Sequence, residues 1–514
     1  MTARIPPVLR PEHPSARSLG GLIEEFGLEH RGSVDGIEIA GVTLSTNDVH
    51  PGDLFVGMPG AHSHGASFAS KAKEGGAVAV LTDAAGAELA ASTGLPILIV
   101  DSPRAALGEI SAWVYRTREY PPLLFGTTGT NGKTSTSHLL EGILRQLGLV
   151  TGLSSTSERH IGDLVVVSRL TTPEASEMHA LLARMRESEV RAVVLEVSAQ
   201  ALSRNRVDGI EFDVVAFTNL THDHLDDYAD MEEYFQAKLP LFQPDHGKRG
   251  VVSLDSPYGQ RVVDESHIPV TTISTTPGIV AEWNVEILDE QAAYTEFRLT
   301  GPNHRSLTTR VPLIGWHMAA NAGLAIVMLV EAGFELEAIG QALDADGGID
   351  ARLPGRIERV SGDTGPTVYV DFGHSADAFL QTLAAVRTVT TGRVIMVFGA
   401  DGDRDASKRH EMARVASEGS DILVITDHHP RFENAASIRA TLVEGAALAE
   451  HQAELHEVSP PESAIRTAVS LAKEGDSILW AGPGHQDYRD IEGVRTPYSA
   501  RDEARNALRE AGWA

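Results

Sequence analysis

The sequence of 514 residues contains no cysteine. Disulfide bonds and thiolate-held metal ions are therefore excluded, and any bound metal must be held by oxygen or nitrogen ligands. This favours magnesium over a structural zinc ion.

Long hydrophobic runs are missing as well. No stretch approaches the roughly 20 consecutive apolar residues that a membrane-spanning helix needs. The N-terminal segment MTARIPPVLRPEHPSARSLGG also lacks the apolar centre of a secretion signal. We therefore expect no membrane insertion and a cytoplasmic protein.

Positive charge is scarce, because 43 Lys and Arg residues oppose 71 Asp and Glu residues, giving a formal net charge of −28. Such a charge repels nucleic acid, which we therefore do not expect as a partner, although a local basic pocket can still bind an anionic substrate. The contents of hydrophobic residues (42%) and charged residues (22%) are ordinary for a globular protein. Disorder and a fibrous repeat are thus disfavoured.

The length exceeds what one hydrophobic core supports, so several domains are expected. Short apolar runs alternate with helical patterns, which predicts an α/β fold of parallel strands and crossover helices. We expect a loose, Pro-rich segment followed by three domains. The predicted limits are 1–20 for the segment, 21–118 for a small N-terminal α/β domain, 119–348 for a central domain with a parallel-rich sheet, and 349–514 for a C-terminal α/β domain.

The most informative motif is the glycine-rich segment GTTGTNGKT at 126–134. It follows the strand pattern PLLFG and precedes the helix pattern KTSTSHLLEGILRQLG, the context of a phosphate-binding loop. Backbone N–H groups can approach phosphate oxygens there, and the helix N-terminus adds a positive dipole. Lys133 would neutralise the β and γ phosphates, and Thr134 would offer its hydroxyl to magnesium. The predicted ATP-binding residues of the loop are Gly129, Thr130, Asn131, Gly132, Lys133, Thr134 and Ser135.

An ordinary glycine-rich turn is the alternative for this segment, and a phosphate loop alone does not separate kinases, hydrolases, ligases and transporters. Glu196 adds a second indication, because it ends the apolar run AVVL and can project from a strand tip toward magnesium.

At GTTGTNGKTS the sequence resembles the Mur ligase family, and within it the MurE type. The resemblance extends over nearly the whole chain. The other matching segments keep the family's order. They are PGDLFVGMPG, LTTPEA, LEVSAQAL, FTNLTHDHLD, AKLPLF, GWHMAAN, LPGRIE, VDFGHSAD, GDRDASKR, HHPR and AGPGH, of which PGDLFVGMPG precedes the loop.

The resemblance implies an ATP-dependent ligase of three domains. The first would bind the UDP end of the substrate, the second would be a P-loop ATPase, and the third would be a Rossmann-like domain that brings a free amino acid. ATP would phosphorylate the terminal carboxylate of UDP-N-acetylmuramoyl-L-Ala-D-Glu, and the amine would attack the acyl phosphate, adding the third amino acid in peptidoglycan synthesis. We expect a monomer.

The resemblance also implies roles for individual residues. The implied catalytic residues are Lys133, Glu196, His224, Lys238, Asp371 and His374, with Asn321 and Arg356 as further ATP contacts. Magnesium would be held by Thr134, Glu196, His224 and Lys238, the last only if carbamylated. An unmodified helix-surface lysine is the alternative for Lys238.

The substrate-binding residues come from the same resemblance. Those implied for the UDP dipeptide are Thr46, Thr171, Thr172, Ser198, Arg204 and Arg206. Those implied for the amino acid are Arg404, His428, His429, Arg431, Gly482 and Gln486.

The amino-acid segment departs from relatives that add meso-diaminopimelate. His428 and His429 replace an Asp-Asn pair, and Gln486 replaces an acidic residue that faces the side-chain ammonium. An unpaired buried ammonium is costly, so diaminopimelate and lysine are disfavoured. We expect a smaller or neutral amino acid such as homoserine, glycine, serine or alanine, or a short diamine using Asp427. In the alternative, nearby acids such as Asp427, Glu433 or Asp487 compensate and diaminopimelate is accepted.

Two other functions remain open at this point. One is a related amide ligase of the folylpolyglutamate or cyanophycin type, which shares the phosphate loop. The other is a nucleotide-binding scaffold without catalysis.

Overall fold

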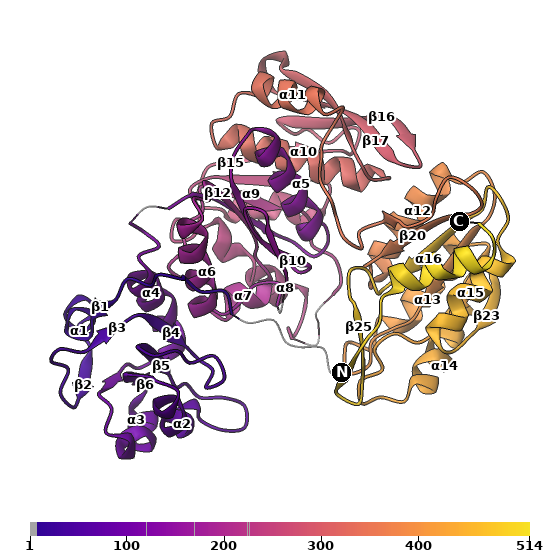
Figure 1. Cartoon of the computed structure of the whole chain (residues 1–514). Coiled ribbons are helices and arrows are strands. Elements are labelled where there is room, and N and C mark those ends of the chain that lie inside the picture. The colour runs from indigo at the N-terminus through magenta and orange to yellow at the C-terminus, as the bar shows by residue number, and fades with distance from the viewer. Residues whose placement is uncertain (1–7, 120, 169, 224, 226, 514) are drawn as a thin grey trace.

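The computed structural model describes residues 8–119, 121–168, 170–223, 225 and 227–513. Three mixed α/β domains follow one another along the chain, each built on its own sheet (Figure 1). The predicted fold class is thereby confirmed, while the residue limits of the domains stay predictions. Among the described residues, no helix is both long enough and apolar enough to cross a membrane.

The N-terminal domain contains a five-stranded sheet in the order β2-β7-β6-β5-β4, parallel except for β2. Its strands are β2 (Glu29–Arg31), β4 (Gly41–Thr43), β5 (Asp53–Val56), β6 (Ala79–Thr82) and β7 (Ile97–Ile99), with a small ladder of β1 (Arg17–Ser18) and β3 (Glu38–Ile39). Its helices are α1 (Leu19–Phe26), α2 (Ala69–Glu74), α3 (Ala84–Ala90), α4 (Pro103–Tyr115) and the short η1 (Gly65–Phe68) and η2 (Ala91–Thr93).

Residues 8–20, part of the segment expected to be loose, make specific contacts with this domain. Arg10 Nη1 donates to the carboxylate of Asp53 at 2.8 Å, and this carboxylate also accepts from the backbone N–H of His50. The side chain of Asp53 is 2% exposed, and a buried carboxylate needs such partners. The lead-in therefore neutralises a charge at the start of β5.

The central domain holds an eleven-stranded sheet in the order β11-β10-β9-β12-β8-β13-β14-β15-β16-β17-β18. The run from β9 to β16 is parallel, and antiparallel hairpins extend it at both ends. The strands are β8 (Leu123–Thr128), β9 (Thr151–Ser154), β10 (Glu158–Ile161), β11 (Leu164–Val167), β12 (Ala192–Glu196), β13 (Val214–Phe217), β14 (Gly250–Ser253), β15 (Val270–Ser274), β16 (Trp283–Gln291), β17 (Tyr294–Thr300) and β18 (Ser306–Val311).

Both faces of this sheet are covered, as its continuous apolar strands require. Phe125 on β8 packs into a core with α5 (Lys133–Gln146) and α10 (Trp316–Glu331), whereas its neighbour Leu124 packs on the opposite face with α6 (Ala175–Glu187). The remaining helices are α7 (Ala199–Ser203), α8 (Met231–Gln236), α9 (Pro257–Glu265), α11 (Leu336–Ala345), η3 (Leu239–Phe242) and η4 (Pro302–His304).

The C-terminal domain has a six-stranded sheet in the order β19-β20-β24-β21-β22-β23, parallel from β20 to β23. Its strands are β19 (Glu358–Arg359), β20 (Thr367–Asp371), β21 (Val394–Phe398), β22 (Ile422–Ile425), β23 (Glu454–Glu457) and β24 (Ser477–Ala481), followed by the hairpin β25 (Tyr488–Ile491) and β26 (Val494–Pro497). Its helices are α12 (Ala376–Val389), α13 (Arg409–Gly419), α14 (Ala435–Ala446), α15 (Pro461–Leu471) and α16 (Ala500–Glu510).

The helices of this domain also cover both faces of the sheet. Side chains of α12, α13 and α14 pack on one face, and those of α15 and α16 pack on the other. The carboxyl ends of the parallel strands are left for polar loops, which is where open α/β sheets bind ligands.

Candidate active site

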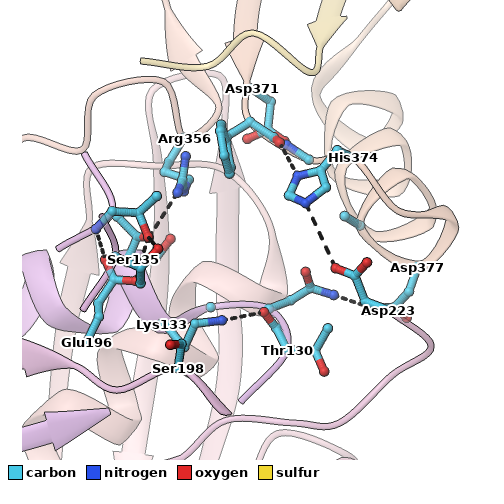
Figure 2. A pocket seen from close by; sticks show the side chains of 18 of the residues that line it. Thr130, Lys133, Ser135, Glu196, Ser198, Asp223, Arg356, Asp371, His374 and Asp377 are labelled. Carbon is cyan, nitrogen blue, oxygen red and sulfur yellow. Dashed lines mark hydrogen bonds and ion pairs between the residues drawn. The ribbon is translucent and has the colours of Figure 1, made fainter. Parts of the chain in front are cut away.

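A cavity of about 1450 Å³ lies between the central and C-terminal domains (Figure 2). Its walls are the loops that follow β8, β12 and β13 on one side and β20, β21, β22 and β24 on the other. Most residues predicted from the sequence line it. They are Thr130, Asn131, Gly132, Lys133, Thr134, Ser135, Thr171, Thr172, Glu196, Ser198, Arg206, Lys238, Asn321, Arg356, Asp371, His374, Arg404, His428, Arg431, Gly482 and Gln486.

The phosphate-loop segment begins after β8 and leads directly into α5. Gly129 (φ +146°) and Gly132 (φ +88°) adopt backbone conformations that favour glycine. A Cβ at Gly129 would lie 1.9 Å from Thr218 Oγ1, and one at Gly132 would lie 2.6 Å from Asn321 Oδ1. Glycine is therefore required at both positions, because of the φ angle and because neighbouring side chains leave no room for a Cβ.

Lys133 folds back over this loop. Its Nζ donates to the carbonyl oxygens of Gly129 at 3.0 Å and Thr130 at 2.8 Å. Burial lowers its pKa, which nearby acids, Glu196 first among them, partly offset. The cation thus lies at the centre of the loop, where a triphosphate would place its negative charge.

Glu196 lies at the tip of β12, fully buried and next to Thr127 of β8. Its carboxylate accepts two hydrogen bonds from Thr156, one from the backbone N–H at 2.8 Å and one from the hydroxyl at 2.9 Å. These contacts fix the orientation of the carboxylate on the cavity wall. Together with the hydroxyl of Thr134, it supplies the oxygen ligands that Mg²⁺ prefers.

Lys238 is 2% exposed although it carries an amine. Its Nζ donates to Gly129 O at 2.9 Å and lies 4.4 Å from the centre of the Tyr234 ring. Burial, together with the nearby charge of Lys133, lowers its pKa well below the ordinary lysine value. The helix-surface alternative for Lys238 is therefore wrong, because the side chain lines the cavity beside the phosphate loop.

Arg356 and Asp371 bring the C-terminal domain onto the phosphate loop. Arg356 Nη2 donates to Thr134 Oγ1 at 2.9 Å, and its guanidinium stacks 4.4 Å from the centre of the Phe372 ring. Asp371 accepts from the backbone N–H groups of Ile357 at 2.9 Å and Gly373 at 2.7 Å. Asp371 therefore orders the turns on either side, one of which carries Arg356.

Two further contacts join the domains. Asn131 Nδ2 donates to Asp377 Oδ2 at 3.0 Å, and Lys408 Nζ forms an ion pair with Asp223 at 3.0 Å. His374 lies close to the same acid, with Nε2 3.9 Å from Asp223 Oδ2 (Figure 2). Burial is the main cause that lowers the pKa of His374.

A group of hydroxyls lies beside Glu196. Thr172 Oγ1 donates to Glu196 O at 2.8 Å, while Thr171 Oγ1 lies 3.1 Å from the hydroxyl oxygen of Thr156, whose single proton is donated to Glu196. Arg206 is held by the carboxylate of Glu174 at 3.0 Å. This corner therefore offers hydroxyls and a guanidinium, groups that suit anionic and sugar ligands.

The opposite end of the cavity lies in the C-terminal domain. His428 Nδ1 lies 2.7 Å from Asp401 Oδ1, and Arg431 Nη2 lies 3.4 Å from the other oxygen of this carboxylate. His429 is buried, and its Nε2 lies 2.9 Å from Gln486 Oε1. The C-terminal domain lines the cavity with arginines and histidines and also with the acids Asp401, Asp405 and Asp487.

Family comparisons match three consecutive stretches of the chain. The Mur ligase family catalytic domain covers residues 38–115, the Mur ligase middle domain covers 127–329, and the Mur ligase glutamate ligase domain covers 355–484. The chain belongs to the Mur ligase family. As a member, this Mur ligase is an ATP-dependent amide ligase of peptidoglycan synthesis that uses Mg²⁺.

Relatives match this Mur ligase over its full length. A UDP-N-acetylmuramyl-tripeptide synthetase of Leifsonia xyli subsp. xyli is 60% identical, with 100% of both chains covered. A UDP-N-acetylmuramoyl-L-alanyl-D-glutamate–2,6-diaminopimelate ligase of Streptomyces avermitilis is 41% identical, with 99% of both covered.

Solved structures share the architecture. The structure of a UDP-N-acetylmuramoyl-L-alanyl-D-glutamate–2,6-diaminopimelate ligase is 25% identical with a TM-score of 0.66, covering 96% of this chain and 99% of that one. MurF of Acinetobacter baumannii, at 17% identity and a TM-score of 0.67, covers 91% and 96% and shows the shared fold alone.

Some predicted residues of the Mur ligase lie elsewhere. Thr46 lies between β4 and β5 of the N-terminal domain, and Arg204 is exposed with its guanidinium 3.4 Å from Asp227. Neither of them lines the cavity, and nor do Gly129 and His429. His224 lies outside the described residues, so its role stays a prediction.

Sequence reasoning missed several residues of the cavity. Thr156, Asp223 and Asp401 line it and contact predicted site residues, and Lys408 lines it and pairs with Asp223. Asp223 lies inside the quoted segment FTNLTHDHLD, and Lys408 lies inside GDRDASKR. Their positions within matching segments were the available signal, whereas Thr156 had none.

Proposed function

We propose that this Mur ligase adds the third amino acid to UDP-N-acetylmuramoyl-L-Ala-D-Glu with hydrolysis of ATP, in the cytoplasm and as a monomer. The observation that carries the proposal is the single cavity that joins the phosphate loop to Arg431 and His428. A nucleotide and an amino acid could meet within it. The 60% identity to a tripeptide synthetase supports the same substrate class.

The proposed chemistry has two steps. A carboxylate oxygen of the dipeptide takes the γ-phosphoryl group, which releases ADP. The amine of the amino acid then attacks the acyl carbon, the bond to phosphate breaks, and the nitrogen loses a proton as the amide forms. Lys133 and Arg356 would stabilise negative charge on the phosphates, because preorganised cations act strongly in a site that excludes water.

The metal and substrate roles are part of the same proposal. Magnesium held by Thr134, Glu196, His224 and a carbamylated Lys238 would neutralise phosphate charge. Asp371 would keep Arg356 in place, and His374 would face the transferred group. Asn321 would contact the nucleotide, although in the structure it accepts from Thr136 of α5 at 3.3 Å.

The dipeptide would lie along the hydroxyl corner. Thr171, Thr172, Ser198 and Arg206 would bind it there, and Thr46 and Arg204 would contact its more distant parts. Arg404 and Arg431 would hold carboxylates at the amino-acid end, where Gly482, His428 and Gln486 line the wall and His429 bonds to Gln486.

The test is ADP release from ATP with UDP-N-acetylmuramoyl-L-Ala-D-Glu and a panel of amino acids. We expect turnover only when nucleotide-linked dipeptide and amino acid are both present. Turnover with a folate in place of the dipeptide would favour the folylpolyglutamate type. Binding of ATP and dipeptide without ADP formation for any amino acid would favour the scaffold.

Diaminopimelate remains disfavoured in this proposal. The relative from Streptomyces avermitilis is named for 2,6-diaminopimelate, whereas the relative from Leifsonia xyli has a name that specifies no amino acid. Asp427, the acid considered for a short diamine, bonds Arg439 and Ser459 and does not line the cavity. Selection by Asp427 is therefore not supported.

A further inference from the structure

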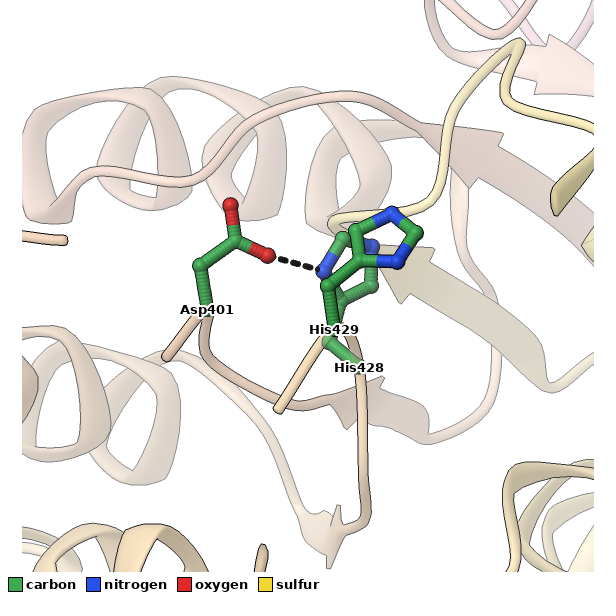
Figure 3. A group of neighbouring side chains, drawn as sticks. All are labelled: Asp401, His428 and His429. Atoms are coloured by element: carbon green, nitrogen blue, oxygen red, sulfur yellow. Dashed lines mark hydrogen bonds and ion pairs between the residues drawn. The ribbon is translucent and has the colours of Figure 1, made fainter. Parts of the chain in front are cut away.

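Asp401 and His428 form a hydrogen-bonded pair in the part of the cavity that the C-terminal domain lines (Figure 3). Asp401 follows β21 and His428 follows β22, so neighbouring parallel strands bring them together. Burial alone raises the pKa of Asp401, but the charge of His428 and its hydrogen bond outweigh it and lower the pKa below the ordinary value. Asp401 is therefore an anion that accepts the Nδ1–H of His428.

The second ring nitrogen of His428, Nε2, makes no hydrogen bond comparable to that of Nδ1 among the described residues. His428 Nε2 is buried and finds no hydrogen-bond partner among the described residues. In the tautomer whose proton lies on Nδ1 and is bonded to Asp401, Nε2 keeps a lone pair that can accept a hydrogen bond. A buried acceptor without a donor is costly, so it is a natural position for a ligand group.

His429 and Gln486 offer no comparable acceptor. His429 Nδ1 accepts the backbone N–H of Asp490 at 3.0 Å, so Nε2 carries the proton and donates to Gln486 Oε1 at 2.9 Å. Burial is the main cause that lowers the pKa of His429 to about 3, and the ring is neutral. The carbonyl of Gln486 thus already accepts a hydrogen bond, and its amide NH₂ has no hydrogen-bond partner among the residues that the structure describes.

Arg431 limits the length of the side chain that can be accommodated. Its guanidinium lies 3.4 Å from Asp401, the residue that holds His428. An amino acid whose α-carboxylate pairs with Arg431 therefore has its side chain close to His428 from the start. Only a short side chain can end there, since the four-carbon stem of lysine extends beyond it.

On the basis of the proposed function, we propose that the Asp401–His428 pair selects an amino acid with a short side chain ending in a hydrogen-bond donor. The donor is a hydroxyl or a primary amine, and it bonds to His428 Nε2. Glycine and alanine lack the donor, and lysine and diaminopimelate are too long. The proposal narrows the class of amino-acid substrates that the sequence left open. It assigns their selection to Asp401 and His428 and not to Asp427.

A metal ion is the competing occupant. Ligand atoms of Asp401, His428 and His429 lie within 4.8 Å of one another, which is compatible with a metal site. However, both ring nitrogens of His429 already take part in hydrogen bonds. Only two ligands remain, fewer than a structural or catalytic metal site uses.

The first experiment compares amino acids in the complete reaction with Mg·ATP and the UDP dipeptide. Serine is paired with its methyl analogue 2-aminobutyrate, and homoserine and 2,4-diaminobutyrate are paired with norvaline. We expect kcat/KM for ADP release to be at least about tenfold higher for the donor in each productive pair. Whether the hydroxyl or the amine is preferred identifies the terminal group.

The possible outcomes separate the two proposals. If the methyl analogues react as well as the donors, or if lysine or diaminopimelate has the highest kcat/KM, the selection by His428 is overturned while the ligase function stands. If no amino acid supports ADP release, the proposed function fails, and the selection fails with it.

The second experiment uses variants of His428. His428→Asn retains a donor at the position of Nδ1 but has nothing at Nε2, whereas His428→Gln places an amide near Nε2. We expect His428→Asn to reduce the preference for donors to within about threefold of the methyl analogues, and His428→Gln to restore part of it.

His410→Asn is the matched control, because His410 lies half-exposed on α13 near Glu444. It should leave the preference unchanged. An unaltered preference in a folded His428→Asn protein would overturn the proposal, and Tm measurements identify folding defects in each variant.

Discussion

At the residue scale, Lys238 lies in surroundings that lower its pKa and so favour the neutral amine over the ammonium. A neutral amine, not an ammonium, adds carbon dioxide, and the product is a carbamate with anionic oxygen ligands. Burial beside Lys133 and Tyr234 therefore favours the modification that the sequence could not decide. The same burial would be costly for a lysine with no further use.

Removing the amine of Lys238 should strongly lower turnover, and an added small carboxylate should restore part of it. We expect Lys238→Ala to lower the rate of ADP release about 100-fold or more, because oxygen ligands of magnesium are lost. Acetate or formate should restore part of the rate, since a small carboxylate can enter the vacated space. Lys248→Ala, at an exposed lysine paired with Asp213, is the control. A Lys238→Ala enzyme with ordinary turnover would contradict the role.

At the scale of elements, the phosphate loop depends on two glycines with different surroundings. Gly132 (φ +88°) and Gly148 (φ +83°) have similar backbones, but only Gly132 has close neighbours. Alanine at either site incurs the left-handed conformation, roughly 1–2 kcal/mol. Alanine at 132 also meets the side chain of Asn321.

We therefore expect Gly132→Ala to lower Tm more than Gly148→Ala and to reduce kcat/KM for ATP at least about tenfold. Gly148→Ala should keep ordinary kinetics. Thermal unfolding and steady-state ADP release measure both effects. Equal losses in the two variants would show that φ alone accounts for the requirement.

A cluster of His160, Glu141 and Glu158 in the central domain makes the stability of the protein depend on pH. His160 on β10 lies 2.8 Å from Glu141 of α5 and 3.2 Å from Glu158. Burial opposes its charge, but these hydrogen bonds dominate and raise its pKa to about 9 from an ordinary value of 6.5. Because the folded pKa is the higher one, the stabilisation is complete below about pH 6.5 and is lost as the pH rises through 9.

The contribution of this cluster is roughly 1–3 kcal/mol at pH 6.5. We expect the difference in Tm between the wild-type protein and His160→Gln to be largest near pH 6 and to shrink toward pH 9.5. His456→Gln, at a partly exposed histidine 2.9 Å from Glu454, is the control. A difference that is constant over this range would exclude the charged pair as its cause.

Local patterns predicted the elements of the site better than its contacts. The strand PLLFG and the helix that follows it are signalled by neighbours in sequence, and they correspond to β8 and α5. Thr156, by contrast, holds Glu196 from 40 residues away, and Asn131 meets Asp377 across 246 residues. The first contact depends on how the strands of the central sheet are ordered and the second on how two domains pack, neither of which periodicity encodes. The antiparallel hairpins at the two ends of the central sheet were likewise not anticipated.

At the scale of the whole molecule, the C-terminal domain touches the phosphate loop at several points. Asn131 bonds Asp377, Arg356 bonds Thr134, and Lys408 pairs with Asp223. The structure is therefore a closed arrangement, a state that the sequence left undecided. Each contact uses a residue of the cavity, so closure and assembly of the site coincide.

Weakening one of these contacts should favour opening. We expect Asp377→Ala to increase the radius of gyration in X-ray scattering without nucleotide and to lower kcat/KM for ATP about twofold to tenfold, the equivalent of one hydrogen bond. Asp346→Ala is the control, because it removes a comparable bond to Gln146 within the central domain. An unchanged radius for Asp377→Ala would mean that the remaining contacts suffice.

Asp371 binds two turns with one carboxylate, and this has a consequence for how the enzyme can diversify. A substitution there would disturb the turn of Arg356 and the turn of His374 together, so nucleotide handling cannot be adjusted at this position in small steps. Asp401 and His428, in the loops after β21 and β22, have no comparable bond to the phosphate loop among the described residues, although Lys408 of the first loop pairs with Asp223. New building blocks for the cell wall can thus be recruited by exchanging side chains in those loops while the energy-coupling half of the enzyme is inherited intact.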